Sequence, residues 1–557
     1  MMTLRVGVLV LVAVLGCKKD SSIDQALPVE LKPKPAIVDS SKLKAPALFA
    51  HIPADSPYVI GSFEAVPLDY YAKMKRALGP SVDQMLRQLR ALAEDDGKPS
   101  VLDAILDELD GKLTSQGLES LGFSATPRFA IYGLGLLPVV FRLEVKDHKA
   151  VQATIERVAK KGGATLPATA TRDGRDYWRV PSRELDVVVA LGDNQLVIAI
   201  GPAASIDQSL PLILGTEQPP QNMADGKALA DLMSKHGFGP HLVGFADTKR
   251  IAMQAFTLAG VQPSAACTTE IDRLASNIPR IVMGYSEIST KRASGGAVIE
   301  LSQAWIDELK ALKTEVPALG AALSDEPLVA MGGGLDLARA YRHGQSLVSM
   351  LNRLGEACDS AKLRETAEHL GTAIMRPLPE PIAKITGGVI AIQDISFSAK
   401  SRKGIPDSVE AFALLASTDA KGLVEAAMDL APALSALGLE TDGKLHEVGG
   451  GMLPIPFAVL AGVGDRAVVL AIGDKGKRLA NKAIDAPGNS KVPFFVMSYD
   501  YGKFLALRAR MPDAFGADEP AIDQDVNRRL SELFGRAGAS VDINDKGLVM
   551  WGTIEMK

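Results

Sequence analysis

The feature that most constrains the fold is a repeated order of segments along the chain. Five short β-type segments recur in the same order in the second part, with helical stretches between them. The residue offset between matched segments drifts from about 271 to about 255, which a single deletion explains. A repeat this long predicts two like domains rather than a solenoid. The matched pairs are Tyr58–Gly61 with Leu328–Gly332, Val140–Leu143 with Ala411–Leu414 (offset 271), Val197–Gly201 with Val469–Gly473 (272), Val243–Asp247 with Val496–Asp500 (253), and Ala297–Leu301 with Gly552–Met556 (255).

Each half is predicted to be α+β, an antiparallel sheet with helices packed on it. Segments 185–200 and 456–473 each read as a β-hairpin, the first with a tight Gly192-Asp193-Asn194 turn. Asp147 is the expected cap of a helix that follows one strand pair. The predicted division is 46–318 for the first half and 319–557 for the second, with a connecting helix at 303–312.

The first residues resemble a bacterial lipoprotein signal peptide. A short start with one positive charge precedes an unbroken apolar run, and Cys17 follows small and apolar residues. The run is about half the ~20 residues that a membrane-spanning helix needs. This pattern predicts a signal at 1–16, lipidation of Cys17, and a flexible Lys-, Pro- and Ser-rich linker to residue 45. Lys18 stands where an inner-membrane retention signal has aspartate, which favours the outer membrane, facing the periplasm, over the inner membrane.

Charge and cysteine content limit the function classes. The net charge is −5 without a basic cluster, which argues against nucleic-acid binding. Besides Cys17 there are two cysteines, Cys267 and Cys358. In an oxidising compartment this even pair suggests a structural disulfide, which would join the two halves; the alternative is two separate buried thiols.

The sequence contains no motif that predicts an enzyme. The glycine runs 332–334 and 449–451 lack the ending of a phosphate-binding loop and are interpreted as turn or bulge glycines. The seven histidines are scattered. Glycines and a proline stand between His236 and His241, so these two cannot form a two-ligand face on one helix. No metal and no cofactor are therefore expected. An acidic helix face is read as solvated rather than metal-binding: Asp103, Asp107, Glu108 and Asp110.

One apolar run of thirteen residues, 129–141, is too short to span a bilayer. Its counterpart in the second half is more polar. The run could therefore line an apolar pocket in the first half, whereas the alternative is a strand pair covered on both faces. The candidate pocket residues are Phe129, Ile131, Leu136 and Val140.

The phrase Ile52-Pro53-Ala54-Asp55-Ser56-Pro57-Tyr58-Val59 opens the folded part. With the lipidated cysteine and the linker, it resembles bacterial envelope lipoproteins of a large uncharacterised family. The resemblance implies envelope location and architecture, and no functional residues.

Three functions are compatible with these features. The first is a non-enzymatic envelope protein, anchored to the membrane through lipid on Cys17, that binds a protein partner or has a structural role. The second is a carrier or sensor of an apolar ligand such as lipid, which would need a dry pocket. The third is an enzyme of unrecognised type with a cleft of convergent polar groups between the halves.

Overall fold

The computed structural model describes most of the chain after the linker. The predicted signal peptide, Cys17 and nearly all of the linker lie outside the described residues, as do most of the predicted acidic helix and the glycines at 449–451. The described residues are 43–75, 104, 107–109, 112, 114–161, 170–180, 185–374, 376–397, 406–448, 457–485, 491–510 and 524–557.

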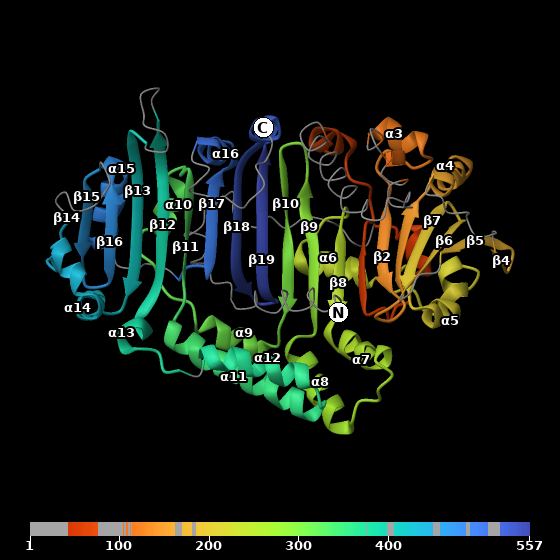
Figure 1. Ribbon diagram of the computed structural model, residues 1–557, viewed down its shortest axis with the longest axis horizontal. Helices are drawn as coiled ribbons and strands as arrows, with labels where there is room; N and C mark the ends of the chain where they lie inside the picture. Colours follow the sequence, from red (N-terminus) through yellow and green to blue (C-terminus); the bar gives the residue numbers. More distant parts are fainter. Residues whose placement is uncertain are drawn as a thin grey trace.

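Within the described residues, nineteen strands form one continuous sheet in which every pair is antiparallel. The sheet runs along the longest axis of the molecule (Figure 1). From one edge to the other, the order is β14 (His446–Val448), β15 (Val459–Val463), β16 (Ala467–Ile472), β13 (Ser408–Ser417), β12 (Ile385–Ser396), β11 (Val329–Gly334), β17 (Phe495–Asp500), β18 (Phe534–Asn544), β19 (Gly547–Met556), β10 (Arg292–Glu300), β9 (Arg280–Ile288), β8 (Val243–Asp247), β1 (Tyr58–Gly61), β2 (Phe129–Gly133), β3 (Val139–Glu144), β7 (Gln195–Gly201), β6 (Asp186–Gly192), β5 (Arg175–Val180) and β4 (Ala170–Arg172).

The α+β class and both predicted hairpins are confirmed. β6 pairs with β7, and β15 pairs with β16. Asp193 and Asn194 both adopt positive φ, the geometry that a two-residue hairpin turn requires. The predicted cap is also confirmed, since the Asp147 carboxylate accepts hydrogen bonds from the amides of Lys149 and Ala150.

Helices lie on both faces of the sheet. In addition, α9, α11 and α12 run across the lower ends of the central strands (Figure 1). Among the described residues none of the helices is long and apolar enough to cross a membrane. The helices are η4 (Ala47–His51), α3 (Ser115–Ser120), α4 (His148–Lys161), α5 (Ala203–Leu214), α6 (Ala228–His236), α7 (Thr248–Leu258), α8 (Ala265–Asn277), α9 (Gln303–Lys310), α10 (Leu319–Ser324), α11 (Leu337–Ala357), α12 (Ala361–Ile374), α13 (Glu380–Ala383), α14 (Ala420–Leu430), η6 (Pro432–Leu437), α15 (Gly473–Asp485), α16 (Tyr501–Arg510) and α17 (Gln524–Leu533), together with helical residues 68–75.

The two faces of the sheet differ in how much they are covered. One face, which we call the core face, packs against η4, α5 and α6 near β1–β8 and against α10 and α15 near β11–β17. The opposite face, which we call the open face, is covered only in patches. There α4 packs on β3 and β7, α9 packs at one end of the central strands, and α16 and α17 pack at the other.

The centre of the sheet is the pairing of β10 with β19, residues that lie about 255 positions apart in the chain. This seam contains nine register pairs, from Arg292 with Glu555 to Glu300 with Gly547. It joins the block of strands that begins with β1 to the block that contains β11–β19. A disulfide between Cys267 of α8 and Cys358, the residue after α11, adds a covalent link between these two parts of the chain.

Candidate functional site

A row of uncharged side chains crosses nine adjacent strands of the open face, at right angles to the strands. Each member is the register partner of the next. Because neighbouring strands lie about 4.8 Å apart, the row is roughly 38 Å long. We call it the apolar row, and from β16 to β9 it consists of Leu470, Ala413, Ile390, Met331, Met497, Ala539, Gly552, Gly295 and Tyr285.

The apolar row is accessible to solvent. Ile390 is 57% exposed, and Leu470, Met331 and Tyr285 are also exposed. Buried large side chains are the norm in a sheet interior, so a contiguous exposed apolar surface of this kind is typical of an interaction site. A second row on the same face is apolar as well, except for one tyrosine: Ile472, Ala411, Ile392, Val329, Tyr499, Ala537, Ile554 and Ala293.

The central part of the open face is hollowed into a groove of about 520 Å³ that crosses the β10–β19 seam. This volume lies in the range of small-molecule sites. Of the described residues that line the groove, none is charged. The floor is made of small residues, and larger apolar and tyrosine side chains stand around it; they include Gly295, Gly552, Ala537, Ala539, Tyr70, Leu242, Tyr285, Met497, Tyr499 and Ile554.

The glycines at the seam differ in what they make room for. A Cβ on Gly296 would lie 2.0 Å from the Met550 carbonyl oxygen, so close strand packing excludes a side chain there. A Cβ on Gly552 would meet no atom nearer than the Gly538 carbonyl oxygen at 3.9 Å. Glycine weakens a strand interior. Because packing does not require glycine at position 552, its effect is to keep the groove floor open.

Helices pack on the open face at both ends of the central strands, on either side of the groove. At one end of the central strands, Ile306 and Leu309 of α9 pack against Ile299 and Leu548. At the other end, Leu505 of α16 and two residues of α17 pack against Ala293 and Phe534, with Tyr70 at the margin. Between these clusters β10, β18 and β19 carry only small residues on the open face, so the groove lies where helix packing stops.

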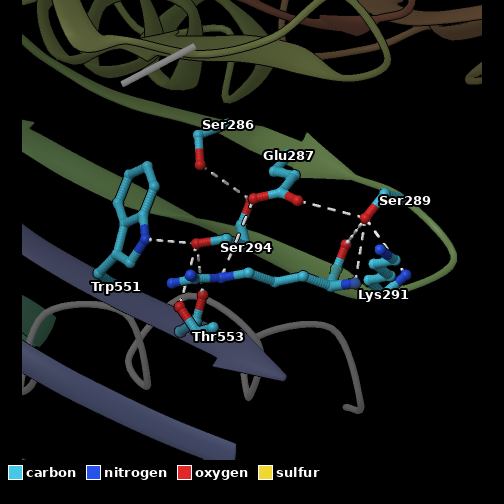
Figure 2. Close-up of polar contacts among 9 residues, drawn as sticks. Ser286, Glu287, Ser289, Lys291, Ser294, Trp551 and Thr553 are labelled. Atoms are coloured by element: carbon cyan, nitrogen blue, oxygen red, sulfur yellow. Dashed lines mark hydrogen bonds and ion pairs between the residues drawn. The ribbon is translucent and has the colours of Figure 1, made fainter. Parts of the chain in front are cut away.

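A polar network on the core face fixes the seam beneath the groove (Figure 2). The indole Nε1 of Trp551 donates to the Ser294 hydroxyl at 2.8 Å, and this hydroxyl lies 3.0 Å from the Thr553 hydroxyl. The Trp551 ring also stacks on Phe238, with 6.1 Å between centroids. All four side chains are buried or nearly so, so these bonds hold β10 and β19 in one register.

A buried carboxylate, that of Glu300, lies at the end of β10 where the seam ends. Glu300, which is 4% exposed, accepts from Lys235 at 2.6 Å, from His236 at 2.8 Å and from Arg280 at 2.5 Å. Burial alone would raise its pKa, but the hydrogen bonds from His236 and Lys235 and the charge of Arg280 lower the pKa to about 2. Burial lowers the pKa of His236, which therefore stays neutral and donates its Nε2 hydrogen to Glu300.

Tyrosines give the groove its hydrogen-bonding groups. Burial raises the pKa of the Tyr70 hydroxyl, and the neighbouring Tyr285 raises it further. Burial also raises the pKa of Tyr499. The phenols of Tyr70 and Tyr499 therefore remain protonated at neutral pH and can donate hydrogen bonds to a ligand, while the tyrosine rings add apolar surface.

The structure does not bring the four predicted pocket residues to one surface. Phe129 and Ile131 project from the open face of β2, and the Phe129 ring lies 6.4 Å from that of Phe141. Val140 is the register partner of Tyr132 and is buried on the core face. Leu136 lies in the β2–β3 loop, where its carbonyl accepts from Tyr58. Side chains alternate between faces along a strand, so an unbroken apolar run feeds both.

The other predicted site residues have definite places. Cys267 and Cys358 are joined by a disulfide with their Cα atoms 4.5 Å apart, packed against Ile271 and Leu354. Cys17 lies outside the described residues.

One reading of the acidic helix is wrong. Glu108, expected on a solvated face, is 4% exposed and bonds to Arg157 and Lys112. Arg157 comes from α4, and Lys112 lies four residues after Glu108. Their positive charges compensate the carboxylate, so it can be buried.

The opening phrase of the folded part has a structural role. The Ser56 hydroxyl donates to the Gly133 carbonyl at 2.9 Å, and Arg250 donates to the carbonyls of Ala54 and Ser56. These bonds tie the start of β1 to β2 and α7. A second hollow of about 520 Å³ lies beside the phrase, with Asp55 on its lining.

The histidines do not form a metal centre as a group. His236 binds Glu300, and His343 Nδ1 lies 2.8 Å from Glu308. In the described part of the chain, one cluster of ligand-type side chains is close enough to hold an ion: Glu440, Asp442 and His446. The histidine there bonds to both carboxylates, and both carboxylate residues are exposed. We assign no ion to it.

Sequence reasoning missed the groove because its residues come from strands far apart in the chain. A signal was present in the glycines and alanines inside strands, at 293, 295–297, 537–539 and 552. Such residues weaken strands unless packing or a ligand requires them.

No known protein family, curated protein or solved structure matches this chain.

Proposed function

We propose that this protein is a non-catalytic envelope lipoprotein, anchored through Cys17, that binds an apolar ligand in the groove across the β10–β19 seam. The observation that carries the proposal is the groove itself, with an uncharged lining and a floor kept open by Gly552. An acyl chain suits this lining, because each buried methylene contributes about 0.8 kcal/mol and needs no polar partner. The lipoprotein signal and Lys18 support placement at the outer membrane, facing the periplasm.

The test combines ligand detection with a variant that fills the groove. We expect native mass spectrometry of the mature protein, purified from its own envelope, to show extra mass in the lipid range that is lost on denaturation. Gly552→Val should remove this mass and weaken binding of N-phenylnaphthylamine, a fluorescent apolar probe, by about tenfold without unfolding the protein.

The matched control is Gly535→Val. Gly535 is a strand glycine as well, in β18, and does not line the groove. A Cβ there would make only ordinary contacts at 3.5 Å or more. Equal probe binding by wild type and Gly552→Val, with a clean mass for the native protein, would overturn the proposal.

The exposed end of the apolar row favours a second function, docking of an envelope protein partner. Ile390, Leu470 and Met331 are 57%, 44% and 39% exposed on the open face, outside the groove. Apolar surfaces of this kind mark protein interfaces. Photocrosslinking from position 390 in whole cells should capture a partner, and the same probe at the exposed position 365 of α12 should not.

We also propose that the sheet consists of two tandem halves, 46–318 and 319–557. β1 lies between β8 and β2, as β11 lies between β17 and β12. Tyr58 faces Ala246 across β1–β8, and Val329 faces Tyr499 across β11–β17. These registers support offsets of 271 and 253, the values that the sequence repeat suggests.

The registers refine one offset and add a symmetry. Arg142 faces Ala130 and Val197, as Leu414 faces Val389 and Val469, which supports an offset of 272 for β3 and β13 instead of 271. With the offset of 255, Gly296 corresponds to Trp551, its own register partner. A pseudo-twofold axis would then pass through this pair, at the centre of the groove.

A cleavage experiment tests the two halves. A protease site inserted between Asp325 and Glu326, which are exposed, should be cut without loss of the native sheet. The two fragments should still elute together after reduction, because the β10–β19 seam and the packing of α10 in the second core hold them. Separation under native reducing conditions would contradict this arrangement.

A further inference from the structure

A third hollow lies at the turn between β9 and β10. It has a volume of about 670 Å³, and its lining includes Lys73, Lys291, Arg292 and Lys557. The same segments line both hollows: helical residues 68–75 contribute Tyr70 to the groove and, one turn later, Lys73 to the turn. Helical residues 68–75 therefore connect the groove to the turn.

Positive charge is in excess at this turn. The four cations are accompanied by two carboxylates, of Glu287 and Glu555. Arg292 lies 4.0 Å from Glu287. The ammonium of Lys73 donates to the Thr290 carbonyl at 2.6 Å and that of Lys557 to the Ser531 carbonyl at 2.9 Å. Neutral carbonyls do not cancel these charges, so an anion at the turn gains Coulomb energy.

The turn that carries Lys291 is held in one shape. The Ser289 hydroxyl accepts from the amides of Lys291 and Arg292, at 3.3 and 3.0 Å, and lies 3.2 Å from the Glu287 carboxylate (Figure 2). Lys73 adds a bond from the helix to the same turn. Lys291 is therefore presented by an ordered turn, and Lys73 by the helix that is bonded to this turn.

From this juxtaposition we infer that the ligand is an amphiphile with an oxyanion head. Its acyl chain lies in the groove, from Tyr285 toward Met497, and its carboxylate or phosphate lies at Lys73 and Lys291. The inference rests on the proposed function and adds the polarity and direction of the ligand. Charge complementarity selects this occupant, because a neutral hydrocarbon leaves the cationic turn unused and a free anion leaves the groove unused.

The groove itself supports this direction. Tyr70 and Tyr285 line the groove together, and Tyr285 belongs to β9, the strand that leads into the turn; a head group or its ester needs donors at this end. At the other end, Met497 leads to Met331 and Ile390, which offer only apolar surface. From Tyr285 to Met497 the groove crosses five strands, a length of about 19 Å.

The experiment compares two probes with the same hydrocarbon chain, palmitate and hexadecanol, by calorimetry on the full mature protein. We expect palmitate to bind about tenfold more tightly than hexadecanol. In Lys73→Gln/Lys291→Gln, palmitate should lose this advantage while hexadecanol binding stays unchanged. Lys73→Arg/Lys291→Arg should restore it, since the charge returns.

A control removes the same charge elsewhere. Lys362→Gln/Lys421→Gln, on α12 and α14, should leave binding of both probes unchanged.

If palmitate and hexadecanol bind equally to the wild type, the inference fails and the proposed apolar site stands. If neither binds, both fail. Inorganic phosphate should not displace palmitate at millimolar concentration; lysine-dependent phosphate binding with no preference for palmitate would show a free-anion site and overturn the lipid head.

Discussion

Arg142 and Leu414 occupy matching places in two regions of the same sheet, yet they stabilise their surroundings in opposite ways. Arg142 is 1% exposed and bonds to the Tyr132 hydroxyl, to Gln195, and to the carbonyls of Leu212 and Ile213 at the end of α5. The side chain of Leu414 is buried among apolar neighbours. The comparison shows that one strand arrangement accepts a polar or an apolar core, provided that each polar group has a partner.

The helix end explains why a guanidinium is tolerated. The carbonyls of Leu212 and Ile213 lie in the last turn of α5. The Gly215 amide donates to the Leu212 carbonyl, and Arg142 supplies donors to both carbonyls. Its charge lies near the negative end of the helix dipole. The same charge and burial lower the pKa of the nearby His51 to about 4, with burial as the larger cause, so this histidine is neutral at physiological pH.

The largest expected effect separates these two cores. Arg142→Ala should lower the free energy of unfolding by about 3–5 kcal/mol, because it leaves a cavity and unsatisfied acceptors. Arg142→Leu, which copies the other region, should remain destabilising, because it fills the space but removes the donors to the Ile213 carbonyl and to Gln195. Leu414→Ala should cost about 2–4 kcal/mol through the cavity alone. Urea denaturation measures all three; an Arg142→Leu protein as stable as wild type would show that the polar contacts contribute nothing.

The disulfide tests how far the two regions depend on each other. Replacing Cys267 and Cys358 with serine should lower the free energy of unfolding by about 2–4 kcal/mol, since the bond closes a loop with a sequence separation of 91. Without it, we expect calorimetry to resolve two transitions, one for each core. A single unchanged transition would mean that the β10–β19 seam alone couples the regions.

Acid should weaken the contacts by which Glu300 joins β10 to β9 and to the end of α6. Its folded pKa of about 2 lies below its ordinary value of 4.5, so its contribution to stability is complete above pH 4.5 and is lost as the pH falls toward 2. The loss should amount to about 2–3 kcal/mol. Glu300→Gln should flatten this part of the pH profile. A wild-type profile identical to that of the variant between pH 5 and 2 would contradict the assignment.

The smallest effect concerns the open face. Leu143 and Leu415 have matching register partners, but α4 packs on Leu143 whereas Leu415 is 39% exposed. Leu143→Asn should cost about 1–2 kcal/mol, and Leu415→Asn about 0.5 kcal/mol. Thermal unfolding of the pair checks this. Equal losses would mean that the exposed end of the sheet is covered in solution.

Local features could be predicted from the sequence because local chemistry determines them. The Gly192-Asp193-Asn194 turn and the Asp147 cap are examples, since the backbone conformation and the cap depend on neighbouring residues. The face to which a strand residue points could be predicted less well. In the run 129–141 every residue is apolar, so nothing in the pattern separates Ile131 from Val140.

The site could not be predicted because it depends on pairing across the whole chain. Gly295 and Gly552 meet only when β10 pairs with β19, and the sequence places both in ordinary strands. The turn lysines show the same limit: Lys73 and Lys291 are 218 positions apart and meet only because helical residues 68–75 pack beside the β9–β10 turn. The partners of Glu108 and Glu300 also come from other elements.

The ends of the sheet have a consequence for a protein tethered to a surface. The described sheet ends in β4 and β14, each only three residues long. An edge strand exposes unpaired amides and carbonyls that can pair with a neighbouring molecule. Lipid anchors would confine many copies to two dimensions, where neighbours meet often. Short terminal strands offer few hydrogen bonds to such neighbours, so a broad sheet can stay unpolymerised even when the membrane is crowded.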